Sequence, residues 1–249
     1  WLKPCMSLQR SLWMDAPGRR PPCPFRLLAL TLISRTAALW PTDPVPCRDD
    51  LAVVAQRHFY RTGWAAEVGV LKGEFARRNV GRWHGVYFMI DSWAFRPGAD
   101  DFDLNFEVDL INRRNFMMAR SAVRHAANRT RIVQGLSTDV AGQFEDGVFD
   151  WVYIDALHTY KAVKRDLNAW YPKVRQGGLI SGDDWADSEA TALMTPKREV
   201  ELHISQISQD LRWGVIRAVT EFARSKGHQL FVTYMRDCYP YPAWYFVKD

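Results

Sequence analysis

Three aspartates in the second half of the chain have the residue type and spacing of a divalent-cation site. Asp155 ends the apolar run 149–155, and Asp183 and Asp184 follow the run 179–182. If these runs are neighbouring parallel strands, the three carboxylates meet at one edge of the sheet, where they repel unless a cation or protons lie among them. Oxygen ligands favour Mg²⁺ and suit zinc poorly. The spacing predicts a shared metal site; the alternative is that these residues cap a helix and pair with basic side chains.

A histidine lies close to this predicted site. His158 follows Asp155 by three residues, at the start of the next predicted helix. Because imidazole titrates near neutrality, His158 can remove a proton from a hydroxyl group, as can Asp155. We therefore predict both as catalytic residues. A turn histidine that is hydrogen-bonded to the backbone is the equal alternative for His158.

A glycine turn follows the first apolar run of the chain. Glu67 precedes Gly69 and Gly73 in the segment EVGVLKG, and Asp91 ends the next apolar run. Glycines let the backbone turn sharply against a ligand, and an acid about 20 residues further on can accept hydrogen bonds from ribose hydroxyls. Leu71 occupies the second glycine position of the nicotinamide-type motif GxGxxG, which argues against that cofactor. The alternatives are glycines that serve packing and an acid that caps the next turn.

Strands and helices alternate along the chain, which predicts βαβ units and a mainly parallel sheet. Short apolar runs predict strands at 64–70, 86–91, 131–135, 149–155, 179–182, 230–234 and 244–247. Apolar residues at helical spacing predict helices at 49–60, 74–79, 103–127, 161–171 and 215–225. The two closing strands are joined so closely that we expect a hairpin, with one antiparallel strand.

Five stretches spread over residues 55–249 carry a family resemblance. They read AEVGVLKGEFA, MIDSW, FDWVYIDALHTYKAVKRDLNAWYPKVRQGGLISGDDW, GVIRAVTEF and PAWYFVK. Together they resemble the class I S-adenosylmethionine-dependent methyltransferases, in particular methyltransferase domain family 24, which is related to macrolide-sugar O-methyltransferases and cephalosporin-hydroxylase-like proteins. The resemblance implies an α/β, Rossmann-like fold with a seven-stranded sheet and helices on both faces. It also implies S-adenosylmethionine as cofactor, bound by Glu67, Gly69, Gly73, Asp91 and Ser137.

The function that this resemblance implies is transfer of a methyl group to a hydroxyl of a small molecule, such as a sugar or a secondary metabolite, with the help of Mg²⁺ or another divalent cation. Two alternatives come from other classes. One is a nicotinamide-dependent oxidoreductase on a similar sheet, and the other is a binding protein without catalytic activity.

Basic charge is concentrated at the beginning of the chain. The first 48 residues hold seven basic and two acidic residues, whereas the remaining 201 hold 26 of each, so the net charge of +5 lies entirely in this segment. The body therefore shows no electrostatic signature of nucleic-acid binding. Eight prolines in the same segment disfavour regular structure. We expect 1–48 to be a disordered extension and 49–249 to be the domain, with the polar stretch 186–212 as a lid.

No segment predicts a membrane span. The apolar run 27–33 is far shorter than the roughly 20 residues that a spanning helix needs. Residues 14–40 faintly resemble a targeting segment, and a cytoplasmic protein is the default expectation.

Overall fold

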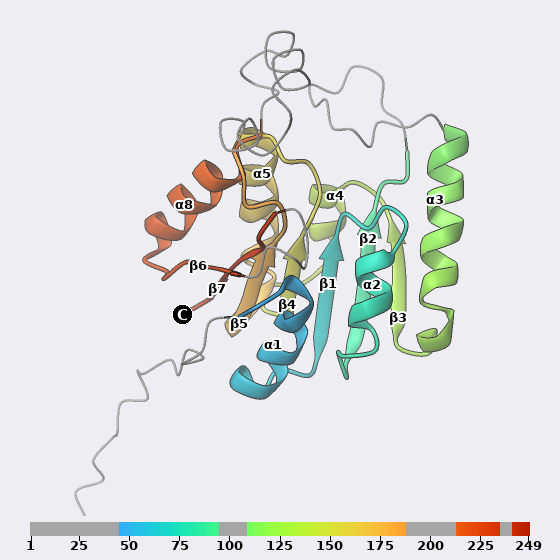
Figure 1. Cartoon of the computed structure of the whole chain (residues 1–249), viewed down its shortest axis with the longest axis horizontal. Helices are drawn as coiled ribbons and strands as arrows, with labels where there is room; N and C mark the ends of the chain where they lie inside the picture. The colour runs from blue at the N-terminus through green and yellow to red at the C-terminus, as the bar shows by residue number, and fades with distance from the viewer. Residues whose placement is uncertain (1–44, 95–108, 188–212, 235–240) are drawn as a thin grey trace, which may run out of the picture. The chain divides into compact units, whose positions relative to one another are not determined.

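The computed structural model describes residues 45–94, 109–187, 213–234 and 241–249 (Figure 1). Most of the predicted extension and lid therefore lie outside the described residues. The elements, in chain order, are η1 (Arg48–Asp50), α1 (Leu51–Phe59), β1 (Trp64–Val68), α2 (Glu74–Asn79), β2 (Val86–Asp91), α3 (Asp109–Ala122), η2 (Arg124–Ala126), β3 (Thr130–Gln134), α4 (Ser137–Ala141), β4 (Phe149–Ile154), α5 (Tyr160–Trp170), β5 (Val174–Gly182), α8 (Val215–Lys226), β6 (Phe231–Val232) and β7 (Trp244–Val247).

The strands form one seven-stranded sheet of order β3-β2-β1-β4-β5-β7-β6. Strand β7 runs antiparallel to both of its neighbours, and the other pairs are parallel. This arrangement confirms the Rossmann-like methyltransferase fold, including its one antiparallel C-terminal strand. The chain moves outward from β1 to β3 and then returns to β4 on the other side of β1. Such a reversal leaves a crevice at the carboxyl ends of β1 and β4, where ligands bind in open α/β sheets.

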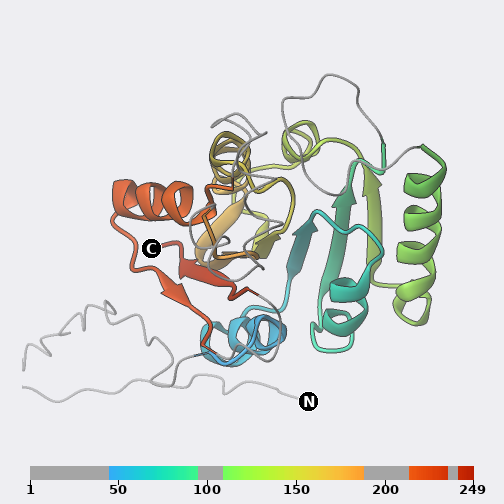
Figure 2. The same cartoon turned by 45° about the horizontal axis from the view of Figure 1, so that its top comes forward.

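Helices cover both faces of the sheet (Figures 1 and 2). Side chains of α1, α2 and α3 share one apolar core with one face, and those of α4, α5 and α8 share a second core with the other. The alternation of side chains along each strand produces this division. On β1, Ala65 belongs to the first core, whereas Ala66 and Val68 belong to the second.

Three elements differ from the prediction. Strand β5 begins at Val174 rather than at 179, and Gly177 within it has a φ of +69°, so the strand bends where the paired glycines suggested a break. The long predicted helix 103–127 is α3 followed by η2, and its first residues lie outside the described ranges. Helix α4 was not predicted, because five residues are too few to show helical periodicity.

Among the helices of the described ranges, none combines the length and the apolar character needed to cross a bilayer.

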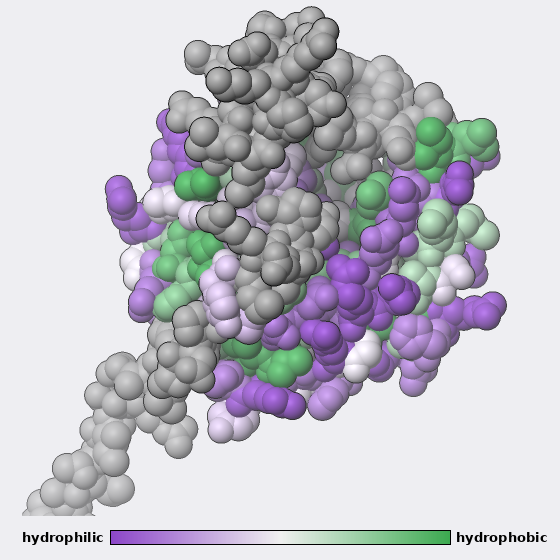
Figure 3. Space-filling view, viewed as in Figure 1, coloured by the Kyte–Doolittle hydropathy of each residue, from purple (hydrophilic) through white to green (hydrophobic). Residues whose placement is uncertain are grey.

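Truncation of a core leucine tests the packing of α5 against the sheet. Leu167 is fully buried in the second core, so Leu167→Ala should lower the free energy of unfolding by about 2–5 kcal/mol through lost burial and a residual cavity. Leu110→Ala is the matched control, because Leu110 in α3 is 77% exposed. Figure 3 shows hydrophobic and hydrophilic side chains together on the side of the molecule that carries α3. The control should change stability by less than about 0.5 kcal/mol in the same urea titration. Equal effects of the two substitutions would contradict the assignment of the core.

Candidate functional site

The turn after β1 lies directly against the residue that follows β4. Gly69 has a φ of +89°, and a Cβ atom at this position would lie 1.8 Å from the carbonyl oxygen of Asp155. The Gly69 amide donates a hydrogen bond of 2.8 Å to the carbonyl oxygen of Ile90. Only glycine fits here, because any side chain would push the ends of β1 and β4 apart. The predicted glycine turn therefore abuts the predicted metal site.

Asp91 orders this turn. Its Oδ2 accepts hydrogen bonds from the amides of Val70 (2.8 Å) and Leu71 (2.9 Å), and its Oδ1 accepts one from the amide of Trp93 (2.8 Å). The hydrogen bond from Trp93 is the capping of the next turn that was the alternative for Asp91. Each carboxylate oxygen has two lone pairs, so Oδ1 can also accept a hydrogen bond from a ligand hydroxyl. The two roles are compatible, and the cofactor role stays a prediction.

The backbone near the sheet's carboxyl edge is strained at several points. At this edge Leu71, Trp93 and Asp184 have positive φ angles of 52°, 40° and 50° although they are not glycines, and Tyr60 at the end of α1 is a further case elsewhere. Such conformations persist only where the surroundings hold them, and they are common in ligand-binding sites. Trp93 helps to hold this edge, because its Nε1 donates to the carbonyl oxygen of Leu71 at 2.8 Å.

Gly73, the second glycine of the turn, serves helix packing. It has a φ of +77°, and a Cβ atom here would lie 2.8 Å from the Cα of Ala119 in α3. The structure thus shows a packing requirement at Gly73, and its contact with a cofactor stays a prediction.

Glu67 lies beneath the turn. Its side chain is 1% exposed, and its Oε2 accepts a hydrogen bond of 2.9 Å from the hydroxyl of Tyr87. Burial raises the pKa of Glu67 well above its ordinary value of 4.5, the Tyr87 hydrogen bond opposes this rise, and the nearby charge of Asp155 adds to it. The structure therefore places Glu67 under the glycine turn and not on its surface, and its contact with a cofactor stays a prediction.

Ser137 begins α4, immediately after the loop that follows β3. Its hydroxyl donates to the carboxylate of Asp166 and accepts a hydrogen bond of 2.9 Å from Nε1 of Trp170. Both partners belong to α5, so the Ser137 side chain links the two helices. The predicted cofactor contact of Ser137 stays a prediction.

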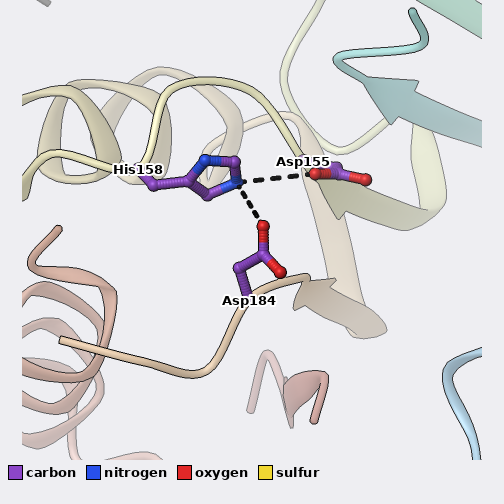
Figure 4. Close-up of side chains that lie close together, drawn as sticks. All are labelled: Asp155, His158 and Asp184. Atoms are coloured by element: carbon purple, nitrogen blue, oxygen red, sulfur yellow. Dashed lines mark ion pairs between the residues drawn. The ribbon is translucent and has the colours of Figure 1, made fainter. Parts of the chain in front are cut away.

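Asp155, His158 and Asp184 form a compact cluster (Figure 4). Nε2 of His158 lies 3.1 Å from Oδ2 of Asp184 and 3.5 Å from Oδ1 of Asp155. Strands β4 and β5 pair in parallel with Ile154 opposite Gly182, which brings the residues that follow them together. His158 is 8% exposed, and its ring packs against Trp213 at a centroid distance of 4.8 Å.

Asp183 is not part of this cluster and pairs with a basic side chain. Its Oδ2 accepts a hydrogen bond from Nη1 of Arg48, which also lies 3.9 Å from Oδ2 of Asp155. Both residues follow the end of β5, and the φ of +50° at Asp184 turns the chain there, so Asp183 and Asp184 have different neighbours. The structure thus brings together Asp155, Asp184 and His158 and pairs Asp183 with Arg48. Whether Asp183 binds a metal stays a prediction.

Arg48 is the site residue that the sequence did not reveal. We expected it to lie in the extension, yet it is 6% exposed in η1, and Val45 before it is 1% exposed. No local pattern marks Arg48, because its partner is 135 positions away. A cluster of buried acids does require a counter-charge, but that requirement alone does not say which arginine supplies it.

The donor set of the cluster fits a divalent cation. Ligand atoms in adjacent positions of an octahedron with bonds of about 2.1 Å lie about 3.0 Å apart. The one ligand atom that each residue offers lies within 4.8 Å of the other two, and the two distances from His158 Nε2 are 3.1 and 3.5 Å. Two carboxylates suit Mg²⁺ or Mn²⁺, and the imidazole nitrogen also admits Zn²⁺. These atoms could hold a cation after a small adjustment.

Comparisons with known proteins agree with the fold. A family model described as a methyltransferase domain matches residues 66–185. The O-methyltransferase TomG of Streptomyces achromogenes, involved in tomaymycin synthesis and solved with S-adenosylmethionine, is 14% identical, with 81% of this chain and 79% of that chain covered and a TM-score of 0.52. An O-methyltransferase of Bacillus cereus, solved with S-adenosylhomocysteine, is 16% identical, with coverage of 85% and 86% and a TM-score of 0.50. No curated protein sequence matches the chain. At these identities the structural likeness shows the fold alone.

The buried acid beneath the turn predicts a specific pH dependence of stability. Because the pKa of Glu67 is raised in the folded state, its favourable contribution is complete below about pH 4.5 and is lost as pH rises through the folded pKa. Glu67→Gln keeps an acceptor for Tyr87 and has no charge. Above pH 4.5 the variant should therefore gain stability relative to the wild type by up to about 1.4 kcal/mol per pH unit.

Urea unfolding at several pH values measures this difference. Glu74→Gln in α2 is the control, because Glu74 is exposed. Its unfolding free energy should follow the wild-type pH curve. A constant difference between Glu67→Gln and the wild type at all pH values would contradict the prediction.

Proposed function

Because residues 66–185 belong to a methyltransferase domain family, we propose that this chain transfers the methyl group of S-adenosylmethionine to a hydroxyl oxygen of a small molecule such as a sugar or a secondary metabolite. The described fold matches O-methyltransferases that were solved with S-adenosylmethionine or its demethylated product, which supports this choice of donor and acceptor atom. A divalent cation at Asp155, His158 and Asp184 completes the proposal.

The observation that carries the proposal is the close approach of Gly69 to the backbone of Asp155. This contact sets the glycine turn, which would bind the donor, beside the cluster that would bind the acceptor. Methyl transfer is an in-line displacement, so holding the donor and the acceptor in a fixed relative position supplies much of the rate acceleration. The short distance between the two parts of the site meets this requirement.

The side chains of the cluster have separable tasks in this proposal. A bound divalent cation would make an acceptor hydroxyl easier to deprotonate. Asp155 and Asp184 would hold it with one oxygen each, and Asp155 would keep its second oxygen near the acceptor. Nε2 of a neutral His158 has a single lone pair, so this nitrogen can bind the cation or accept a proton but cannot do both.

The cofactor assignment predicts a loss of affinity when Asp91 is replaced. Asp91→Ala should weaken the binding of S-adenosylmethionine by about 1–3 kcal/mol, because it removes a charged hydrogen-bond acceptor for ribose and loosens the turn. Isothermal titration calorimetry measures this effect. Asp139→Ala removes an equal charge from the exposed first turn of α4 and should leave the affinity unchanged. Tight binding of NADH without binding of S-adenosylmethionine would favour the oxidoreductase alternative.

The cation assignment predicts that chelation abolishes methyl transfer. The assay follows labelled methyl from S-adenosylmethionine into a panel of sugars and phenols, with excess EDTA and then with added Mg²⁺ or Mn²⁺. EDTA should stop transfer and spare cofactor binding, and the metal should restore activity. Asp155→Ala and Asp184→Ala should each lower the rate by about 100-fold or more.

His158→Ala should have a smaller effect on this rate than either aspartate substitution, because the two carboxylates would still hold the cation and Asp155 could still accept the proton. Full activity in excess chelator, or a wild-type rate in Asp155→Ala, would refute the cation assignment. Binding of S-adenosylmethionine without transfer to any acceptor of the panel would favour a binding protein without catalytic activity.

A further inference from the structure

We propose that Arg48 is a positioning residue that draws Asp183 away from the cation site and so limits the protein ligands to Asp155, His158 and Asp184. The inference rests on the proposed function, because it concerns the same cation. It assigns a role to a residue that lies before the segment matched by the family model, residues 66–185.

The guanidinium of Arg48 is enclosed between acids and an aromatic ring. Its side chain is 7% exposed, its Nη1 donates to Oδ2 of Asp183, and the same atom lies 3.9 Å from Oδ2 of Asp155. The guanidinium carbon lies 5.1 Å from the centroid of the Phe75 ring, a cation–π contact. One nitrogen thus lies near both Asp183 and Asp155, so Arg48 occupies the space between a predicted ligand and its neighbour.

The segment that carries Arg48 is held in place by contacts that do not involve Asp155 or Asp183. In η1, Asp49 forms an ion pair of 2.8 Å with Arg78 of α2, and Asp50 lies 3.6 Å from Nη1 of Arg82. Val45 is buried in the first core. These contacts anchor the backbone on both sides of Arg48, so its side chain enters the site from a firmly held position.

Asp183 depends on this arginine for charge compensation. The residue is 2% exposed, and among the described residues its Oδ1 has no hydrogen-bond partner while its Oδ2 is bound by Arg48. A buried carboxylate that loses its counter-charge is strongly unfavourable and seeks another cation. Without Arg48, Asp183 would therefore compete for the divalent cation beside it. With Arg48 present, Asp183 does not bind the cation, so the cation has one negatively charged ligand fewer. Its binding is therefore weaker, and a coordination position stays open for an acceptor.

The test measures Mn²⁺ affinity in the full chain by electron paramagnetic resonance titration, without any methyl acceptor. Arg48→Met removes the charge and retains an apolar stem, and it should tighten Mn²⁺ binding by about tenfold or more. Arg48→Lys keeps the charge and should stay within about threefold of the wild type. Asp184→Asn removes a ligand and should weaken binding by about tenfold or more, which sets the scale for a lost ligand.

The decisive variant is Arg48→Met combined with Asp183→Asn, which is neutral at both positions and avoids an unpaired buried carboxylate. We expect the Mn²⁺ affinity of this double variant to return to within about threefold of the wild-type affinity. Affinity as weak as that of Asp184→Asn would show that Asp183 is a ligand and would overturn the proposal. An unchanged affinity in a folded Arg48→Met would overturn it as well, because a purely structural arginine would not alter cation binding.

Thermal unfolding of the same variants without the cation measures how much the pairing of Arg48 with Asp183 contributes to stability. Arg48→Met should lower the midpoint, and the added Asp183→Asn should recover most of that loss. If the wild type binds no Mn²⁺, the cation of the proposed function fails and this inference fails with it. If the wild type binds Mn²⁺ but the double substitution does not restore affinity, the inference alone fails.

Discussion

Negative charge gathers where β4 and β5 end, and much of the site's structure is a response to it. The parallel pairing of these strands places Asp155, Asp183 and Asp184 close together, and burial keeps water from screening Asp183 and Asp184, while the Asp155 side chain is 25% exposed. Within the described residues, Arg48 pairs with Asp183, and Nε2 of His158 faces the other two carboxylates. A divalent cation would add positive charge beside Asp155 and Asp184, and it would supply chemistry as well as charge balance.

The sequence predicted most of the sheet because buried strands are short apolar runs that end at polar residues. The sequence was less informative for β5, which continues through a bend at Gly177. Only the part after this bend has the apolar pattern of a strand. The same weakness applies to α4, which has five residues and no periodicity. Local patterns thus reveal elements with regular burial and miss those whose shape depends on their neighbours.

The candidate site was predictable where it depends on strand ends. Asp155, His158 and Asp184 were all predicted from their positions after apolar runs, and they are the three residues that the structure brings together. The partner of Asp183 was not predictable, because Arg48 is 135 positions earlier in a segment rich in proline and arginine. Glu67 shows a related limit: the spacing placed it just before the glycine turn but did not show that its side chain is buried beneath that turn. Contacts between distant parts of the chain determine both the partner of Asp183 and the burial of Glu67.

The distance in sequence between Arg48 and Asp183 also bears on the order in which the protein is made. During synthesis Arg48 leaves the ribosome long before β5 exists, and its charge must remain hydrated until that strand is complete. Contacts between residues so far apart are slow to form, because a long loop must close before they bring any gain. The edge of the sheet that carries the chemistry is therefore expected to mature after the first strands have paired. Nascent chains that end before β5 would lack Asp183 and Asp184, and their site would be unfinished.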